Sequence, residues 1–236
     1  IGKIGQGLSF DGVDDYVVTT TLNGFSANDK VTFSAWVKPT SLDSTQNIVL
    51  DGNSDTRIRI EVSQDNKARI GVGNGVGWTI PNNFVEGISV LSVNTWYHIT
   101  GMWDGSNIKL FVNGTQDNNS LAYTGGTAGM LGVTIGEYSG AKGTFMFPGL
   151  IDEVRIYNRA LTEAEIKRLY LAGSSFHPNV TNKSTIRDGL VGHWSFDGND
   201  MGTTSARDAS GAGNTGWLIN GPVRTIGKIG IKQINS

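Results

Sequence analysis

Three histidines are the residues best suited to acid-base or metal chemistry, because imidazole titrates near neutral pH and is a common metal ligand. They are His98, His177 and His193, and none of them lies in a metal-binding motif such as HExxH. The chain contains no cysteine, no GxSxG motif and no P-loop. The sequence therefore predicts no catalytic nucleophile or base.

Two pairs of adjacent acidic residues are the remaining candidates for catalysis. They are Asp14–Asp15 and Asp152–Glu153. Neighbouring residues on a strand point to opposite faces, so neither pair can flank one glycosidic bond as the two carboxylates of a glycosidase do. We expect a binding or structural protein and no enzyme.

A glycine-rich segment offers oxygen ligands of the kind that calcium prefers. In "DASGAGNTG", Asp208 and Asn214 flank a turn whose carbonyl groups could complete a coordination shell. The alternative is that both residues simply stabilise the turn, as Asp and Asn side chains often do. We predict a structural Ca²⁺ and keep the turn role as the alternative.

Aromatic residues near predicted turns are candidate platforms for a sugar ring, because sugars stack on aromatic faces and bind nearby polar groups. These candidates are Trp78, Trp103, Tyr138 and Trp217. Core packing is the alternative role for each of them. The tryptophans within predicted strands, Trp36, Trp96 and Trp194, are expected to fill the core.

The elements that must position these side chains are strands. Among 236 residues, 33 are glycine and only 17% are charged, which is typical of a turn-rich β protein. The net charge is −2, with no basic stripe, so a nucleic acid partner is not expected. No apolar run approaches the ~20 residues of a membrane span.

Local patterns predict both strands and one helix. In residues 57–62, apolar and polar side chains alternate, which predicts a strand with one buried and one solvated face. In "ALTEAEIKRLY", Thr162 and Glu165 form a capping box that starts a short helix of about two turns.

The order of segments is unusual. We divide the chain into a body (1–173), a polar linker (174–188) and a tail (189–236) that restarts with "GLVGHWSFDG". The tail is too small to be stable alone, so it must pair with another sheet. The pentapeptide IGKIG occurs twice, at 1–5 and at 226–230.

Several phrases together resemble the laminin-G-like family of concanavalin A-like jelly rolls. They are "LSFDGVDDYV", "VTFSAWVKP", "NTWYHITGMWDGSNIKLFVNG", "GLIDEVRIYNRALTEAEIKRLY" and "GLVGHWSFDG" with "DASGAGNTGWLINGP". The resemblance implies an all-β, antiparallel two-sheet jelly roll with one short helix, in an extracellular or cell-surface protein. It also implies that Asp152 adds a carboxylate to the calcium site of Asp208 and Asn214.

In that family the "GLVGHWSFDG" segment comes first, whereas here it follows the helix. Three arrangements fit this order: the tail closes its own domain, it inserts into the next subunit, or the chain is cut from a tandem array. The repeated IGKIG favours exchange between copies. We predict a self-assembling, adhesive homopolymer, with a monomeric calcium-dependent carbohydrate-binding module, or an accessory domain of a larger surface protein, as the alternative.

The predicted assembly contact joins tail and body. Its residues are Leu190, Gly192, Trp194 and Phe196 of the tail and Val154 and Ile156 of the body.

Overall fold

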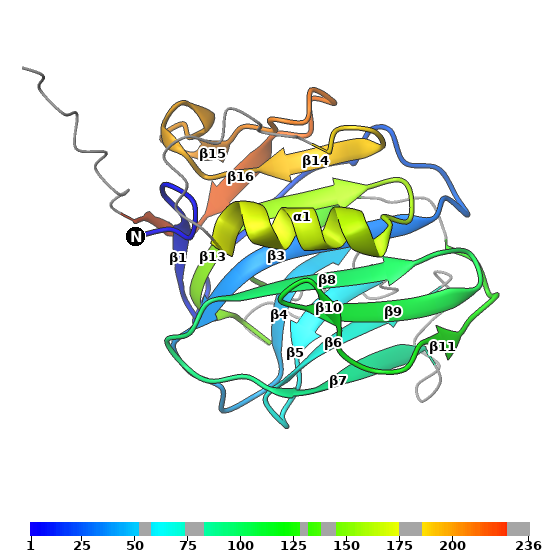
Figure 1. Cartoon of the computed structure of the whole chain (residues 1–236). Coiled ribbons are helices and arrows are strands. Elements are labelled where there is room, and N and C mark those ends of the chain that lie inside the picture. The colour runs from blue at the N-terminus through cyan, green and yellow to red at the C-terminus, as the bar shows by residue number, and fades with distance from the viewer. Residues whose placement is uncertain (52–57, 74–82, 128–131, 138–144, 175–185, 226–236) are drawn as a thin grey trace, which may run out of the picture.

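The computed structural model describes residues 1–51, 58–73, 83–127, 132–137, 145–174 and 186–225, and the account below concerns these residues. They form two antiparallel sheets packed face to face, with one α-helix outside them (Figure 1). The predicted all-β jelly-roll fold is confirmed. No helix among the described residues has the length and apolarity to cross a bilayer.

The first sheet has nine strands within the described residues, in the order β10-β9-β8-β3-β13-β1-β17, with β11 beside β9 and β14 beside β13. Their bounds are β1 (Leu8–Asp11), β3 (Val31–Pro39), β8 (Tyr97–Trp103), β9 (Asn107–Val112), β10 (Thr115–Gln116), β11 (Leu121–Ala122), β13 (Pro148–Tyr157), β14 (Leu190–Trp194) and β17 (Val223–Arg224).

The second sheet has eight described strands, in the order β15-β16-β2-β12-β4-β5-β6-β7. Their bounds are β2 (Tyr16–Val18), β4 (Gln46–Asp51), β5 (Ile58–Val62), β6 (Lys67–Val72), β7 (Phe84–Val90), β12 (Val133–Ile135), β15 (Ser205–Ala206) and β16 (Gly216–Ile219). A short 3₁₀ helix, η1 (Gly198–Asp200), follows β14.

One apolar core fills the space between the sheets. It combines strand residues such as Phe33, Ile60 and Ile99 with Trp194 and Phe196 from the tail, all fully buried. Since burial of apolar surface stabilises by about 25 cal/mol per Å², the tail contributes directly to the stability of the body. Trp36 and Trp194 lie in strands and are buried, as predicted. The same prediction was wrong for Trp96, which lies just before β8 and is only partly buried.

The helix α1 (Glu163–Ser174) covers part of the outer face of the nine-stranded sheet (Figure 1). Ile166 and Leu169 pack there against Phe111 and Tyr157, in a second apolar cluster. The predicted capping box is present, and the helix runs for 12 residues, longer than the two turns expected.

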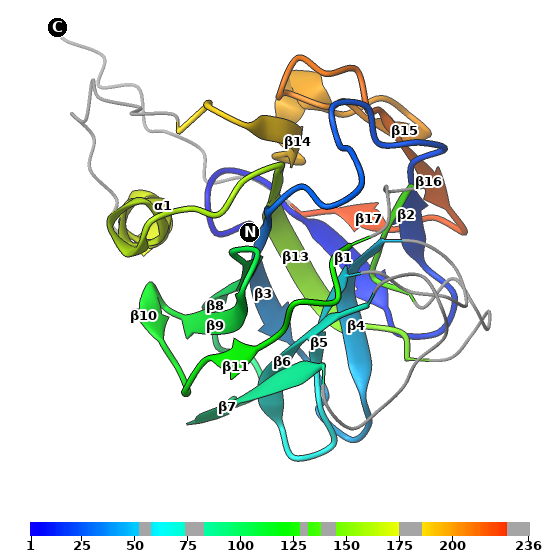
Figure 2. The same ribbon diagram turned by 90° about the vertical axis from the view of Figure 1, so that its right-hand side faces the viewer.

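The tail pairs with its own chain. In β14, Trp194 lies opposite Val154 and Gly192 lies opposite Ile156 of β13. The adjoining part of the same edge of β13 pairs with β1, so β1 and β14 lie end to end along it (Figure 2). Farther along the tail, β16 pairs with β2 and β17 pairs with β1, so the tail completes both sheets.

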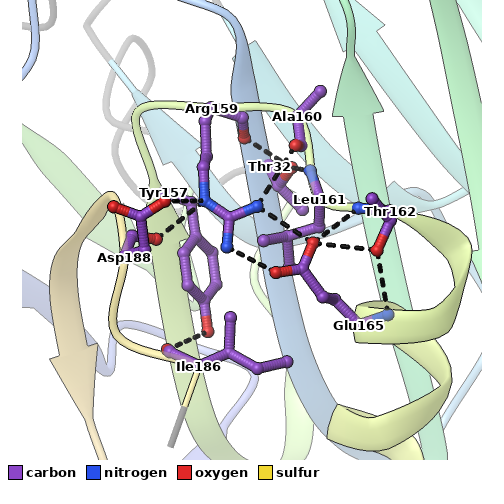
Figure 3. Close-up of polar contacts among 9 residues, drawn as sticks. All are labelled: Thr32, Tyr157, Arg159, Ala160, Leu161, Thr162, Glu165, Ile186 and Asp188. Carbon is purple, nitrogen blue, oxygen red and sulfur yellow. Dashed lines mark hydrogen bonds and ion pairs between the residues drawn. The ribbon is translucent and has the colours of Figure 1, made fainter.

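A polar network fixes the helix and the end of the linker to the body (Figure 3). The guanidinium of Arg159 donates to both carboxylate oxygens of Glu165, at 2.9 and 2.6 Å. Its Nε donates 2.8 Å to the backbone oxygen of Asp188, and the hydroxyl of Tyr157 donates to the Ile186 carbonyl. The network therefore links β13, α1 and the last residues of the linker, directly before the tail.

Candidate functional site

The two ends of the described chain meet over a bulge in β13. At this bulge Glu153 has a φ of 53°, and the preceding Asp152 side chain is fully buried. Oδ2 of Asp152 accepts hydrogen bonds from the backbone amides of Lys3 (2.7 Å) and Ile4 (2.9 Å). Its Oδ1 is buried without a hydrogen-bond partner.

Burial, with further contributions from the charges of Glu153 and Asp197, raises the pKa of Asp152 to about 8. A carboxylate oxygen in this state lacks the positive or donating partner that would stabilise its charge. A bound calcium ion would supply one. Asp152 therefore fits the role of a calcium ligand, and the charge of Asp197, which the sequence did not single out, acts on the same carboxyl group.

Asp208 and Asn214 are brought together, but as parts of a turn. Asp208 accepts four hydrogen bonds: from the amides of His193, Ser210 and Asn214, and from the Ser210 hydroxyl. A carboxylate has about four acceptor sites, so those of Asp208 are filled. Oδ1 of Asn214 accepts from the amide of Asn23 at 2.8 Å. These bonds favour the alternative role, that of stabilising the turn.

An acidic group lies in the β1–β2 turn, where the sequence did not predict a shared site. One oxygen each from Asp11, Asp14 and Asp15 lies within 4.8 Å of the others. Asp14 and Asp15 precede β2, so the strand argument that separated them does not apply. The amides of Val13 and Asp14 donate hydrogen bonds to the Asp11 carboxylate. These bonds lower the pKa of Asp11, and the bond from Val13 contributes most.

A continuous row of side chains crosses the outer face of the eight-stranded sheet. Register pairs join its members from β16 to β7: Trp217, Val18, Thr134, Leu50, Arg59, Gly71 and Phe84. With strands about 4.8 Å apart, the row spans roughly 29 Å. This face is separate from the one that α1 covers.

Charged residues gather at the β5–β7 end of this row. Glu61 is fully buried and forms ion pairs with Arg59 (3.0 Å) and Arg69. Both guanidiniums also lie 4.8 Å from the centre of the Phe84 ring. Burial raises the pKa of Glu61, although the two arginines act in the opposite direction. The alternation in β5 was predicted correctly, but the prediction that its polar face is solvated was wrong, since Arg59 and Glu61 are both buried.

A glycine shapes the same end of the row. A Cβ on Gly71 would lie 2.4 Å from the Phe84 ring, so the ring occupies the space above the glycine. The ring therefore lies over Gly71, beside the two arginines.

Asn47 lies opposite Glu61 in the neighbouring strand. It is 1% exposed, and neither its Oδ1 nor its Nδ2 has a hydrogen-bond partner. Leaving buried polar atoms unbonded costs about 1–3 kcal/mol each, so such atoms often mark a place where a ligand or water completes the bonding. No local pattern pointed to Asn47, because its environment depends on the cross-strand register.

The four predicted sugar platforms have different outcomes. Trp217 is 49% exposed at one end of the row and stays a candidate. Trp103 is 3% exposed, and its indole NH donates to the Tyr123 carbonyl, so its assignment as an exposed platform was wrong: it fills the core. Trp78 and Tyr138 lie outside the described residues.

The residues of the predicted assembly contact do meet, but within one chain. Gly192 and Trp194 lie opposite Ile156 and Val154, while Leu190 pairs with Tyr157. Phe196 is fully buried in the core. In the structure, the contact that we expected between subunits therefore forms between β14 and β13 of the same chain.

Comparison with known proteins agrees with this architecture. Residues 11–167 match the family model described as the concanavalin A-like lectin/glucanases superfamily. No curated protein matches the chain significantly.

Similar solved structures include a Bacteroides ovatus protein described as carbohydrate-binding, with a TM-score of 0.70 and 17% identity over 96% of this chain. The chain spans 61% of that protein's length. A heptameric pentraxin from Limulus polyphemus has a TM-score of 0.59 and 16% identity, covering 72% of this chain and 83% of its own. Domain 4 of an extracellular arabinanase from Geobacillus stearothermophilus, in complex with arabinotriose, has a TM-score of 0.53 and 22% identity, covering 72% and 78%.

Proposed function

The chain belongs to the concanavalin A-like lectin/glucanase superfamily, and on that premise we propose that it is a non-catalytic carbohydrate-binding module. Its binding surface is the outer face of the eight-stranded sheet. The observation that carries this proposal is Asn47, a buried amide with both polar atoms unbonded, beside the charged residues of the same face.

The chemistry of the face suits a sugar. Sugar hydroxyls both donate and accept hydrogen bonds, as an amide requires, and Glu61 and Arg69 offer charged partners next to it. The exposed indole of Trp217 provides an apolar surface for a sugar ring at the other end of the row. The names of similar structures, a carbohydrate-binding protein and an arabinotriose complex, support the same class of ligand.

The test is a glycan array followed by calorimetry with the oligosaccharides that bind. We expect Asn47→Ala and Trp217→Ala to weaken binding at least tenfold. The control is Val223→Ala, at an exposed apolar residue on β17 outside the row. Unchanged affinity in both variants would place the site elsewhere, and a folded protein that binds no glycan would refute the proposal.

We also propose that a calcium ion binds at Asp152, with Asp197 as second carboxylate. The support is the buried, unpartnered Oδ1 of Asp152 and its raised pKa. Calcium should raise the thermal midpoint of the wild-type protein, and EDTA should reverse the rise. Asp152→Asn should abolish this response, whereas Asp208→Asn should keep it. A response that persists in Asp152→Asn would rule out this ligand.

Assembly into a homopolymer is the second candidate, and the tail supplies its geometry. A neighbour's β14 could occupy the edge of β13 that the chain's own β14 takes. The pairing within one chain favours the monomeric module, which we expect to act outside the cell or at its surface. Light scattering distinguishes the two: a uniform mass near 25.2 kDa supports the module, and a concentration-dependent series of larger species supports assembly.

A further inference from the structure

The first copy of IGKIG occupies a built site, which we call the pentapeptide seat. Its wall is formed by the Asp152 carboxylate, the Trp36 ring and Asp197. The amides of Lys3 and Ile4 donate to Asp152, and Nζ of Lys3 lies 4.4 Å from the centre of the Trp36 ring. A Cβ on Gly5, which has a φ of 66°, would lie 2.1 Å from Oδ1 of Asp197.

The seated segment is a closed loop. Gly2 is buried, and a Cβ added to it would lie 2.1 Å from the carbonyl oxygen of Gln6 and 2.7 Å from the amide nitrogen of Gly7. Residues 2–7 therefore return to their starting point. Gly2, at the start of the loop, therefore lies beside Gly7 at its end.

The described part of the tail ends beside the same glycine, Gly7. β17 runs antiparallel to β1, with Arg224 opposite Leu8, and delivers the chain to Thr225. The amide of Thr225 donates to the Gly7 carbonyl, and the Gly7 amide donates to the Thr225 hydroxyl, both at 2.9 Å. Figure 1 shows the amino terminus next to the end of β17. Residue 226, the first of the second IGKIG, is next in sequence after Thr225, which is hydrogen-bonded to Gly7 at the end of the seated loop.

We propose that the seat binds either copy of IGKIG, and that residues 226–230 of the same chain take it when residues 1–5 leave. The seat contacts described above use backbone amides, glycines and the lysine side chain, and each of these has an identical counterpart in the second copy. Lys228 and Ile229 correspond to Lys3 and Ile4, and Gly227 corresponds to Gly2.

The first copy has one advantage, the residue that follows it. The amide of Gln6 donates to Asp197 at 2.7 Å, and its side-chain oxygen accepts from the amide of Gly198 at 2.8 Å. Ile231 stands in the corresponding place after the second copy and has no side-chain amide. The seat contacts named above have counterparts in the second copy, so we expect a small perturbation of the first copy to shift the population to the second.

The experiment compares Gly2→Ala, Gly227→Ala and the double variant, with Gly198→Ala as the control. A Cβ on Gly198 has no heavy atom within 4 Å, so this control adds the same methyl group near the seat without a clash. We expect each single variant to melt within about 1 °C of the wild type, because the intact copy fills the seat. The double variant should lose several degrees, far more than the sum of the singles.

Hydrogen exchange read by mass spectrometry locates the occupant. The two copies fall in different peptides, because Gln6 follows one and Ile231 the other. Protection should lie on residues 3–4 in the wild type and move to residues 228–229 in Gly2→Ala, while the protein stays a monomer. The proposal is overturned if Gly2→Ala destabilises as much as the double variant without protecting 228–229. It is also overturned if protection there accompanies a larger molecular mass, since the occupant would then come from another chain.

Discussion

The ion pair of Arg159 with Glu165 should make folding stability depend on pH in a specific way. This bidentate pair, with smaller contributions from Thr162, lowers the pKa of Glu165 from 4.5 to about 2. A pKa depressed by this amount corresponds to about 3 kcal/mol. Since 15% of the Glu165 side chain is exposed, we discount this for solvent screening to about 2 kcal/mol.

The sign follows from the direction of the change. A carboxylate with a lowered pKa in the folded state stabilises fully above its unfolded pKa, and the stabilisation is lost as the pH falls through 4.5 towards 2. Glu165→Gln should therefore cost about 2 kcal/mol at pH 7, and about half of the difference from wild type should vanish between pH 5 and pH 3.

Urea unfolding at each pH gives the required free energies, and the quantity to plot is wild type minus variant, because other carboxylates titrate in both proteins. Glu163→Gln is the matched control, since Glu163 lies exposed in the same helical turn. A difference for Glu165→Gln that stays constant from pH 7 to pH 3 would refute the electrostatic reasoning. So would an equal pH-dependent difference for the control.

Three further predictions probe the remaining structure. Ser34→Ala removes the 2.8 Å hydrogen bond to Nε2 of buried His98, and urea unfolding at pH 7 should register a loss of about 1–3 kcal/mol. Burial lowers the pKa of His98 to about 3, so the folded state should lose stability as the pH falls below 6.5. In thermal melts, His98→Gln should flatten this decline of the melting temperature with pH, and an unchanged slope would contradict the prediction. Trp194→Ala should lower the free energy of unfolding by about 3–5 kcal/mol, whereas exposed Trp217→Ala should change it by less than about 0.5 kcal/mol; equal effects would mean that the tail is not part of the core.

Local sequence patterns identified the elements well. The alternation in β5 and the capping box at Thr162 depend only on residues a few positions apart, so they can be recognised in the sequence itself. The same reasoning failed for the outer face of β5. Glu61 is neutralised partly by Arg69, which belongs to the next strand, so only the register of β5 with β6 explains how a charge is buried there.

The candidate sites were harder to predict because their contacts are distant in sequence. Asp152 meets the amides of residues 3 and 4 across 149 and 148 positions. The family resemblance pointed to Asp152 as a calcium ligand, but it grouped Asp152 with Asp208 and Asn214. The hydrogen-bonding groups of those two residues are engaged in their own turn and with Asn23. Trp103 was misassigned because proximity to a turn says little about burial.

The shared edge of β13 has a consequence for how the protein folds as it is synthesised. One half of that edge pairs with β1, which leaves the ribosome before β13, and the other half pairs with β14, more than 30 residues after β13. Contacts between such distant segments form slowly, and an unpaired strand edge is prone to aggregate while it waits. The half of β13 from Val154 to Tyr157 must therefore stay open until the tail emerges. Synthesis rate past residue 190, or a chaperone acting in that interval, should control the yield of soluble protein.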